Sequence, residues 1–447
     1  MNLDDAPPSG NAVASLHKVD TMMSDDVNAN AITDLTVNGR TYEIPKTCAI
    51  AICLDGCEPA YLDEAIAAGL MPNLARMRAE GTDRIAHSVI PSFTNPNNMS
   101  IATGRPPAVH GICGNYLIDP DTGDAVMMND AKWLRAPTVF SEFYRAGKRV
   151  AVVTAKDKLR ALLGDGLAFD QGRAICFSSE KADQATIAIN GIDNASEWLG
   201  EPVPEVYSAA LSEFVFAAGV KLLHEFRPDV MYLSTTDYIQ HKHAPGDPVA
   251  NNFYESFDRY LGELDAGGAA IVVTADHGMK PKHNADGTPA VIYVQDLMDE
   301  WLGKGAARVI LPITDPYVVH HGALGSFATI YLPDGADRTS IVKRLRQVKG
   351  ILTALDRDEA CRFYELPPDR MGDLVITSTE NLTIGTSASE HDLSGLDAPL
   401  RSHGGLTEQE VPFIANRPMP DLGRAPHLRN FDVLQVACTL AARAGAS

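Results

Sequence analysis

The sequence lacks the features that mark a membrane span, a secretory leader or a disulfide framework. No run approaches the roughly eighteen consecutive apolar residues of a membrane-spanning helix, and no basic segment leads into an apolar one at the N-terminus. Cysteine is sparse, with seven scattered residues and no CxxC pair. Such thiols are typical of reduced cytosolic proteins. We therefore expect a cytoplasmic protein that enters no membrane.

Positive charge is also scarce. The chain carries 38 lysines and arginines against 58 aspartates and glutamates, for a formal net charge of −20. An extended nucleic-acid-binding surface would need an excess of cationic side chains, so we expect no nucleic-acid partner. A phosphate-bearing substrate must instead be held by a few local cations or by metal ions. With 447 residues, 45% of them apolar, the chain is long enough for a large core.

Short apolar runs alternate with helical periodicity along most of the chain. Apolar and β-branched residues dominate four runs, as expected of strands buried in a sheet: 48–54, 149–153, 229–233 and 270–274. Segments with helical periodicity lie between them. The pattern therefore predicts an α/β fold of βαβ units, with a mainly parallel central sheet flanked by helices.

The pattern divides the chain into a core and two other parts. Residues 1–36 are polar and aperiodic, which predicts a loose N-terminal extension. Residues 283–372 carry α+β signals without candidate catalytic residues at the strand ends, so we expect an inserted cap. The strand at 373–377 is expected to return to the central sheet. The catalytic core would then comprise 37–282 and 373–447.

Carboxylates and imidazoles follow the expected strands at the points where these end. They are Asp55, the pair Asp237 and His241, and the pair Asp276 and His277. The carboxyl ends of parallel strands meet at one edge of a sheet, where α/β proteins bind ligands. The four-residue spacing of Asp237 and His241 places both on one face of a helical turn. With His403 in a Gly-flanked loop as a sixth member, this set suits two divalent ions of the zinc type.

A candidate nucleophile lies in the loop 89–104. Asn95 is a favourable N-cap and Pro96 a favourable first helical residue. Thr94 would then lie at a helix N-terminus, where free N–H groups favour an anion. A neutral hydroxyl is a weak nucleophile, but metal coordination lowers its pKa. Two alternatives stay open on this pattern alone: Thr94 only caps the helix, or Ser92 is the nucleophile.

Together, these motifs resemble the alkaline phosphatase superfamily, and most closely its nucleotide pyrophosphatase/phosphodiesterase-like branch. The resemblance covers most of 47–282 and about 373–445, and it is carried in order by Leu54-Asp55-Gly56, Phe93-Thr94-Asn95-Pro96-Asn97-Asn98, Thr103-Gly104, His110-Gly111, Asp237-Tyr238-Ile239-Gln240-His241, Ala275-Asp276-His277-Gly278-Met279 and His403-Gly404. It implies an alkaline-phosphatase-like core with two zinc ions per chain. One zinc ion would be bound by Asp237, His241 and His403. The other would be bound by Asp55, Thr94, Asp276 and His277.

Within this branch, three features are similar to those of enzymes that hydrolyse phosphonoacetate: the Ser-Phe-Thr-Asn-Pro-Asn-Asn form of the nucleophile loop, Gly114-Asn115, and the paired Lys156 and Lys158. This resemblance implies that Thr94 attacks phosphorus and forms a phosphothreonine. Asn115 would hydrogen-bond a phosphonate oxygen, and the two lysines would pair with the substrate carboxylate. The substrate would be a small-molecule phosphonate whose C–P bond is cleaved to acetate and phosphate. The diesterase relatives usually have Thr-Phe-Pro-Asn where this chain has Thr-Asn-Pro-Asn.

Other functions and residue roles stay open on the sequence. A phosphodiesterase, pyrophosphatase or phosphomonoesterase of the same superfamily would use the same ligands, and a decayed hydrolase would bind metal or anions without turnover. Taken singly, Asp55, Asn115 and the two lysines would be ordinary turn and loop residues. His243 is an alternative to His241 as a ligand, and a homodimer is compatible with the sequence. His110 is expected to brace its loop, and the other histidines are given no role in the site: His283, His320, His321, His391 and His427.

Overall fold

The computed structural model describes residues 33–313, 323–420 and 428–444. Residues Thr33–Ser447 form one compact unit. The expected N-terminal extension falls mostly outside the described residues, but its last part does not, because Asp34–Val37 forms strand β1 and pairs with β2 (Arg40–Glu43). Within the described residues, no helix is both long and apolar enough to cross a membrane. All seven cysteines are free thiols.

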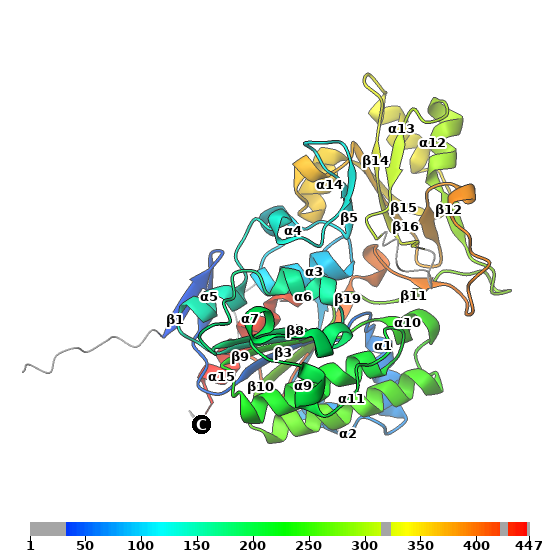
Figure 1. The fold of residues 1–447 in the computed structure, drawn as a ribbon. Helices are drawn as coiled ribbons and strands as arrows, with labels where there is room; N and C mark the ends of the chain where they lie inside the picture. The colour runs from blue at the N-terminus through cyan, green and yellow to red at the C-terminus, as the bar shows by residue number, and fades with distance from the viewer. Residues whose placement is uncertain (1–32, 314–322, 421–427, 445–447) are drawn as a thin grey trace, which may run out of the picture. The chain divides into compact units, whose positions relative to one another are not determined.

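A central sheet of eight strands organises the fold (Figure 1). Its strand order is β20-β4-β19-β10-β3-β9-β7-β8. In chain order, the strands are β3 (Ala49–Cys53), β4 (Thr82–His87), β7 (Val150–Thr154), β8 (Ala174–Ser178), β9 (Val230–Ser234), β10 (Ala270–Thr274), β19 (Glu410–Ala415) and β20 (Leu428–Arg429). The run β10-β3-β9-β7-β8 is parallel throughout, and each of these strands is buried along its whole length. The prediction of an α/β fold with a mainly parallel sheet is confirmed.

Helices cover both faces of this sheet (Figure 1). On one face pack α1 (Pro59–Ala67), α2 (Pro72–Glu80), α9 (Ala210–Glu225) and α11 (Pro248–Ala266). On the other face pack α3 (Thr94–Thr103), α5 (Val139–Arg145), α6 (Asp157–Leu163) and α15 (Val433–Ala442). Because both faces are covered, the central strands are apolar without alternation, as parallel strands require.

A smaller four-stranded sheet is formed by the chain after β10. Its order is β13-β14-β16-β15, all antiparallel, from β13 (Arg308–Ile310), β14 (Phe327–Tyr331), β15 (Ile351–Asp356) and β16 (Leu374–Ser378). Three helices accompany it: α12 (Val294–Leu302), α13 (Arg338–Leu345) and α14 (Arg357–Tyr364). The expectation that 373–377 returns to the central sheet is wrong, because this segment is β16 and pairs with β14 and β15. The chain rejoins the central sheet only at β19.

The helix that carries Thr94 begins earlier than expected. Helix α3 starts at Thr94 itself, with the extended Phe93 as its N-cap, so the predicted N-cap at Asn95 is wrong by two residues. Pro96 then occupies the third helical position. This is tolerated because the first four N–H groups of a helix have no intrahelical partner, so the missing N–H of proline costs nothing there.

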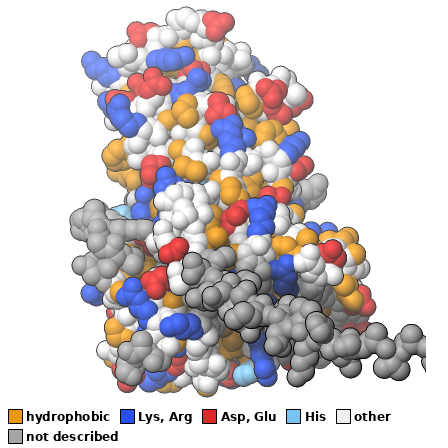
Figure 2. Space-filling model, turned by 90° about the vertical axis from the view of Figure 1, so that its left-hand side faces the viewer, with side chains coloured by type: hydrophobic (Ala, Val, Ile, Leu, Met, Phe, Trp, Pro, Cys, Tyr) orange, Lys and Arg blue, Asp and Glu red, His pale blue; other side chains and the backbone are white. Residues whose placement is uncertain are grey.

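The surface carries charges of both signs. On the face shown in Figure 2, acidic and basic side chains are interspersed rather than gathered by sign. The described residues of that face thus form no broad patch of one sign.

Candidate active site and metal-binding groups

Neighbouring parallel strands deliver polar side chains to one edge of the central sheet. Asp276 and His277 follow β10, Asp55 follows β3, and Asp237 follows β9, which are adjacent in the order β10-β3-β9. The next strand, β7, is followed by Lys156 and Lys158. Because adjacent strands lie about 4.8 Å apart, the carboxylates and imidazoles form a group three strands wide with the two lysines on one side.

A glycine allows the strand ends to crowd together. Gly56 has φ +69°, and a Cβ atom there would lie 2.9 Å from the Cβ of Asp237 and 3.2 Å from that of Gln240. Asp237 precedes helix α10 (Tyr238–Lys242), which carries His241. A side chain at position 56 would therefore push α10 away from the end of β3 and separate Asp237 from Asp55.

The three candidate histidine ligands share one hydrogen-bond pattern. His241 Nδ1 lies 2.9 Å from the Arg401 carbonyl oxygen, His277 Nδ1 lies 2.9 Å from that of Gly278, and His403 Nδ1 lies 2.8 Å from that of Ser92. A carbonyl can only accept, so each Nδ1 carries the proton and donates it. In the neutral imidazole, Nε2 then has the lone pair, as in metal-binding histidines whose other nitrogen is oriented by the backbone.

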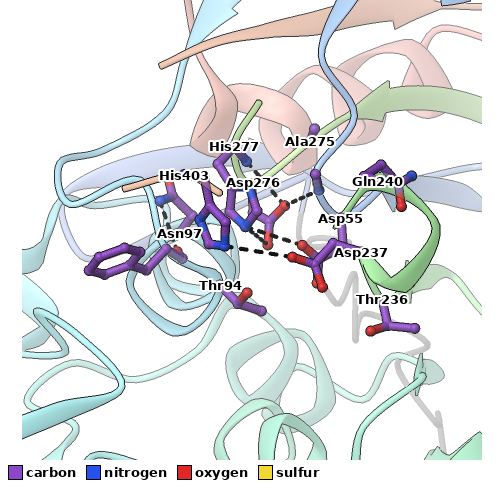
Figure 3. A network of polar contacts seen from close by, with 12 residues as sticks. Asp55, Thr94, Asn97, Thr236, Asp237, Gln240, Ala275, Asp276, His277 and His403 are labelled. Atoms are coloured by element: carbon purple, nitrogen blue, oxygen red, sulfur yellow. Dashed lines mark hydrogen bonds and ion pairs between the residues drawn. The ribbon is translucent and has the colours of Figure 1, made fainter. Parts of the chain in front are cut away.

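These Nε2 atoms lie close to the carboxylates, as Figure 3 shows for His277 and His403. His241 Nε2 lies 2.8 Å and His403 Nε2 lies 3.6 Å from the same oxygen of Asp237, Oδ2. His277 Nε2 lies 3.2 Å from Asp55 Oδ1. The ligand atoms form two groups, each within 4.8 Å: Asp237, His241 and His403 in one, and Asp55, Asp237 and His277 in the other. Asp237 belongs to both groups and lies between them.

Asp276 is held differently from the other carboxylates. It is fully buried, and its Oδ2 lies 3.8 Å from His277 Nε2, outside the two compact groups. Its Oδ1 accepts hydrogen bonds from the backbone N–H groups of His277 and Gly56, at 3.1 and 3.3 Å. The carboxylate is therefore fixed in orientation and faces the Asp55 group.

The pKa values of the three carboxylates are shifted in different directions. Burial, together with the nearby Asp237 and Asp276, raises the pKa of Asp55 well above its usual range. Burial also raises the pKa of Asp276. Although burial opposes it, the adjacent His241 holds the pKa of Asp237 well below its usual range. Three carboxylates this close repel one another unless cations neutralise them.

The pKa values of His277 and His403, two buried histidines that lie side by side, are shifted in opposite directions. Burial disfavours the charged form of His277, yet the negative charges of Asp276 and Asp55 raise its pKa to about 10. Burial and the positive charge of His277 lower the pKa of His403 well below its usual value. A proton on His277 thus partly neutralises the negative charge of the Asp55 group, and a divalent metal cation would neutralise it more fully.

The buried side-chain atoms of Asp55 and His277 also suit a divalent cation. Asp55 Oδ1 and His277 Nε2 are completely buried and lie 3.2 Å apart, and neither has a further hydrogen-bond partner within the described residues. Buried polar atoms are usually well supplied with hydrogen bonds. Mixed imidazole nitrogen and carboxylate oxygen is the ligand chemistry of zinc and similar ions. The residues present therefore fit a divalent metal centre.

Thr94 and the polar residues beyond the carboxylates line one pocket of about 480 Å³. Its lining includes the candidate metal ligands Asp55, Asp237, His241 and His403. It also includes Asn115, Lys156, Lys158 and the aromatic Tyr207 and Tyr238. The pocket thus joins a candidate nucleophile and metal ligands to a pair of ammonium groups.

Local contacts orient the polar groups of this pocket. The side-chain oxygen of Asn115 accepts the backbone N–H of Asn95 at 3.4 Å, so the amide offers its NH₂ group as a donor. The Lys156 ammonium lies over the ring of Tyr207, 5.3 Å from its centroid. Lys156 is the N-cap of α6, and Lys158 lies in its first turn. Both lysines are half-buried rather than fully solvated.

The alternative residues lie elsewhere. Ser92 is buried, and its hydroxyl donates to the Gly405 carbonyl at 2.8 Å. His243 pairs with Asp247 at 3.2 Å. His110 is buried against Ser100. His283 and His391 are outside the pocket lining, and His320, His321 and His427 lie outside the described residues.

Sequence reasoning missed Arg401, which braces the site. Its buried guanidinium donates to the carbonyls of Gln240 and Met279 and to the Tyr61 hydroxyl, at 2.9, 3.2 and 3.1 Å. Its own carbonyl accepts from His241. The partners lie between 122 and 340 residues away along the chain, and nothing in the local sequence of Arg401 marks these contacts.

The chain is similar to several known proteins. The profile of the type I phosphodiesterase/nucleotide pyrophosphatase family matches residues 49–406. The crystal structure of phosphonoacetate hydrolase from Sinorhizobium meliloti 1021 in complex with phosphonoacetate is similar, with 74% identity and a TM-score of 0.89, covering 91% of this chain and 99% of that one. The same enzyme in complex with phosphonoformate aligns equally well.

More distant relatives share the family or the fold. Ectonucleotide pyrophosphatase/phosphodiesterase family member 1 of Rattus norvegicus is 24% identical over 54% of this chain. The chain spans about a quarter of the length of that relative, since the match covers 24% of it. Murine ectonucleotide pyrophosphatase/phosphodiesterase 5 is 19% identical with a TM-score of 0.59, covering 88% of this chain and 94% of that one. This last likeness shows the fold alone.

Proposed function

The chain belongs to the type I phosphodiesterase/nucleotide pyrophosphatase family, and on that premise we propose that it hydrolyses the C–P bond of phosphonoacetate to acetate and phosphate. The observation that carries the proposal is the 74% identity, over 99% of its length, to the Sinorhizobium meliloti phosphonoacetate hydrolase that binds phosphonoacetate. The pocket that joins Thr94 to two lysines supports the same substrate.

The reaction would use two zinc ions per chain. Asp237, His241 and His403 would hold one ion. Asp55 and His277 would hold the other, with Asp276 and Thr94 as its further ligands. Bound zinc would lower the pKa of the Thr94 hydroxyl and offset the charge that builds on the phosphonate oxygens. The buried atoms Asp55 Oδ1 and His277 Nε2, which have no further hydrogen-bond partner beyond each other in the described residues, support this assignment.

Thr94 would be the nucleophile. It is the first residue of α3, partly exposed, and it faces the pocket together with Asp55 and Asp237 (Figure 3). The threonine oxygen would attack phosphorus in line with the leaving carbon and give a phosphothreonine, which water then hydrolyses. The NH₂ group of Asn115 would hydrogen-bond a phosphonate oxygen, because its amide oxygen is already engaged by Asn95.

Lys156 and Lys158 would bind the substrate carboxylate. Cleavage of a C–P bond leaves the electron pair on carbon, and a carbanion is a poor leaving group. A carboxylate on that carbon spreads the charge as an enolate, and an ammonium group stabilises the oxygen that becomes more negative. The lysines follow β7, next to the strand that delivers Asp237, so they lie beside the metal-binding groups. Tyr207 covers the Lys156 ammonium and limits its motion.

The smaller sheet and its helices would form a cap on a core that holds all the proposed catalytic groups. Three hydrogen bonds connect the two parts: Asn115 donates its backbone N–H to Pro312 at 2.7 Å, and the buried Arg370 donates to the carbonyls of Gly111 and Trp133 at 2.6 and 2.7 Å. All three join the segment after β12 (Val291–Tyr293) to the part of the chain around Asn115. The cap would thereby help to set the position of Asn115.

Phosphate release tests the proposal against a phosphodiesterase, pyrophosphatase or phosphomonoesterase. Zinc-loaded protein is incubated with phosphonoacetate, methylphosphonate, an aryl phosphomonoester and an aryl phosphodiester. We expect kcat/KM for phosphonoacetate to exceed that for methylphosphonate by several orders of magnitude, because only phosphonoacetate has the carboxylate. Chelation should abolish this turnover. A preference for either ester, with no phosphate released from phosphonoacetate, would contradict the proposal.

A further inference from the structure

Asn98 lies at the junction of the nucleophile helix, strand β9 and the Asp276 carboxylate. It is one helical turn after Thr94 and completely buried. Its side-chain oxygen accepts the Tyr232 hydroxyl at 2.6 Å and the Ser234 hydroxyl at 2.9 Å. Its side-chain NH₂ donates to the Thr94 carbonyl at 3.0 Å and to Asp276 Oδ2 at 3.2 Å. Four hydrogen bonds thus hold one amide.

Two acceptors fix which way the amide faces. The Thr94 carbonyl and the Asp276 carboxylate can only accept, so the NH₂ group of Asn98 must face them and its oxygen must face away. Tyr232 and Ser234 are two residues apart on β9, so their side chains leave the same face of the sheet. Their hydroxyls donate to the amide oxygen and hold it in this orientation.

Asn98 also completes the support of Asp276. The backbone N–H groups of His277 and Gly56 hold Oδ1 of this carboxylate, and the side chain of Asn98 donates to Oδ2. An oxygen with two lone pairs can accept one hydrogen bond and still bind a cation. With both oxygens held, the carboxylate keeps one rotation about its Cβ–Cγ bond.

We propose that Asn98 is a positioning residue that fixes the Asp276 carboxylate and the first turn of α3 relative to each other. The inference rests on the proposed role of Asp276 in binding metal and of Thr94 as nucleophile. Groups that orient a ligand carboxylate commonly change metal affinity about 10- to 100-fold when they are removed. The same amide donates a hydrogen bond to the Thr94 carbonyl. It therefore couples the position of the nucleophile to that of the metal ligand.

The test uses Asn98→Ala, with Asn190→Ala as its control. Asn190 is also a buried asparagine with two hydrogen bonds, to the Cys176 carbonyl at 2.8 Å and from the Thr186 N–H at 3.1 Å, but it contacts no proposed ligand. Each protein is stripped by chelation and titrated with Zn²⁺ by calorimetry, and its melting temperature is recorded. We expect Asn98→Ala to bind one of two ions about 10-fold or more weaker, and Asn190→Ala to lose stability only.

A second variant tests the same inference if Asn98→Ala fails to fold. Tyr232→Phe combined with Ser234→Ala removes both donors to the Asn98 oxygen and leaves Asp276 and Thr94 unaltered. It should weaken the same ion, but less than Asn98→Ala does, because the amide loses its fixed orientation and keeps its donors. In both variants kcat for phosphonoacetate should fall more than KM rises.

The outcomes separate this inference from the proposed function. Unchanged zinc affinity in Asn98→Ala, or an equal loss in Asn190→Ala, would overturn the role of Asn98. Normal zinc binding in the wild-type protein without turnover of phosphonoacetate would overturn the proposed substrate alone, because affinity is read without substrate. A wild-type protein that binds no zinc would overturn both.

Discussion

The imidazole rings of His277 and His403 lie parallel, with centroids 3.5 Å apart and planes 8° from each other. The two rings come from different parts of the chain, the end of β10 and the loop after β18 (Arg401–Ser402). Despite their stacking they serve different carboxylates, since His277 Nε2 faces Asp55 and His403 Nε2 faces Asp237. Two charged rings at this distance would repel each other. The stack is therefore stable when at most one ring is protonated, or when both are neutral and bind metal.

The first prediction concerns this histidine pair. His277→Ala should lower the zinc content from two ions per chain towards one, because it removes a ligand of the Asp55 group and leaves the Asp237 group complete. Turnover should fall about 100-fold or more, since the ion next to Thr94 is lost. Zinc content is measured by elemental analysis after gel filtration. His243→Ala, which alters a histidine paired with Asp247, should keep both ions, and a full zinc complement in His277→Ala would contradict the assignment.

The second prediction concerns the two lysines. Lys156→Ala or Lys158→Ala should lower kcat/KM for phosphonoacetate about 10- to 150-fold, the range expected when a hydrogen bond to a charged group worth about 1.5–3 kcal/mol is lost. Hydrolysis of an aryl phosphomonoester, which has no carboxylate, should change little. The two substrates are assayed side by side, with the exposed Lys343→Ala as control. Equal losses on both substrates would remove the carboxylate role.

The third prediction concerns the nucleophile. Thr94→Ala should lose turnover by about 1000-fold or more, because nothing else in its position can form the covalent intermediate. Thr94→Ser should retain part of the turnover. Mass spectrometry of acid-quenched wild-type enzyme should find phosphate on the peptide that contains Thr94. Phosphate on Ser92 instead, or its persistence in Thr94→Ala, would show that the nucleophile is misassigned.

The fourth prediction concerns pH and His110. His110 Nδ1 accepts the Ile112 N–H at 3.2 Å and Nε2 lies 2.8 Å from the Ser100 hydroxyl, so a second proton would displace a hydrogen bond. Burial lowers the pKa of His110 to about 3 from the usual 6.5. Between these values the unfolded chain binds the proton and the folded chain does not. The contribution of His110 to stability is therefore complete above pH 6.5 and declines as the pH falls towards 3.

Urea unfolding of wild-type protein and His110→Gln at several pH values between 7 and 4.5 measures this contribution. As the pH falls below 6.5, the free energy of unfolding of the wild type should decrease by up to about 1.4 kcal/mol more per pH unit than that of the variant. Losses common to both proteins, such as those from the metal-binding groups, cancel in the difference. Parallel pH profiles would show that His110 titrates normally in the fold.

The sequence predicted the parts of the fold that depend on local pattern. The strands β3, β9 and β10 are short apolar runs, and their register in a parallel sheet brings Asp55, Asp237 and Asp276 to one edge without further information. Strand β16 was assigned to the wrong sheet because a buried apolar run has the same composition in either sheet. Its partners β14 and β15 are set by tertiary pairing.

The supporting contacts of the site could not be predicted in this way. Asn98 bonds to Tyr232 and Asp276, which are 134 and 178 residues away, and it differs in no local respect from the neighbouring Asn97. The buried pair of Lys282 and Glu408 likewise joins segments 126 residues apart, at 2.9 Å, and Glu408 holds the backbone N–H of Gly405 near His403. Such contacts depend on three-dimensional proximity, which spacing along the chain does not encode.

The most direct test of the central claim follows the C–P bond itself. Phosphonoacetate labelled with ¹³C at the carbon bonded to phosphorus is incubated with zinc-loaded protein and observed by ¹³C and ³¹P NMR. The predicted result is loss of the one-bond carbon–phosphorus coupling, with acetate and inorganic phosphate appearing in equal amounts. With Thr94→Ala, the phosphonoacetate signals should stay unchanged. An unchanged phosphonoacetate signal, under conditions in which the same preparation binds two zinc ions and hydrolyses an aryl phosphate ester, would contradict the account.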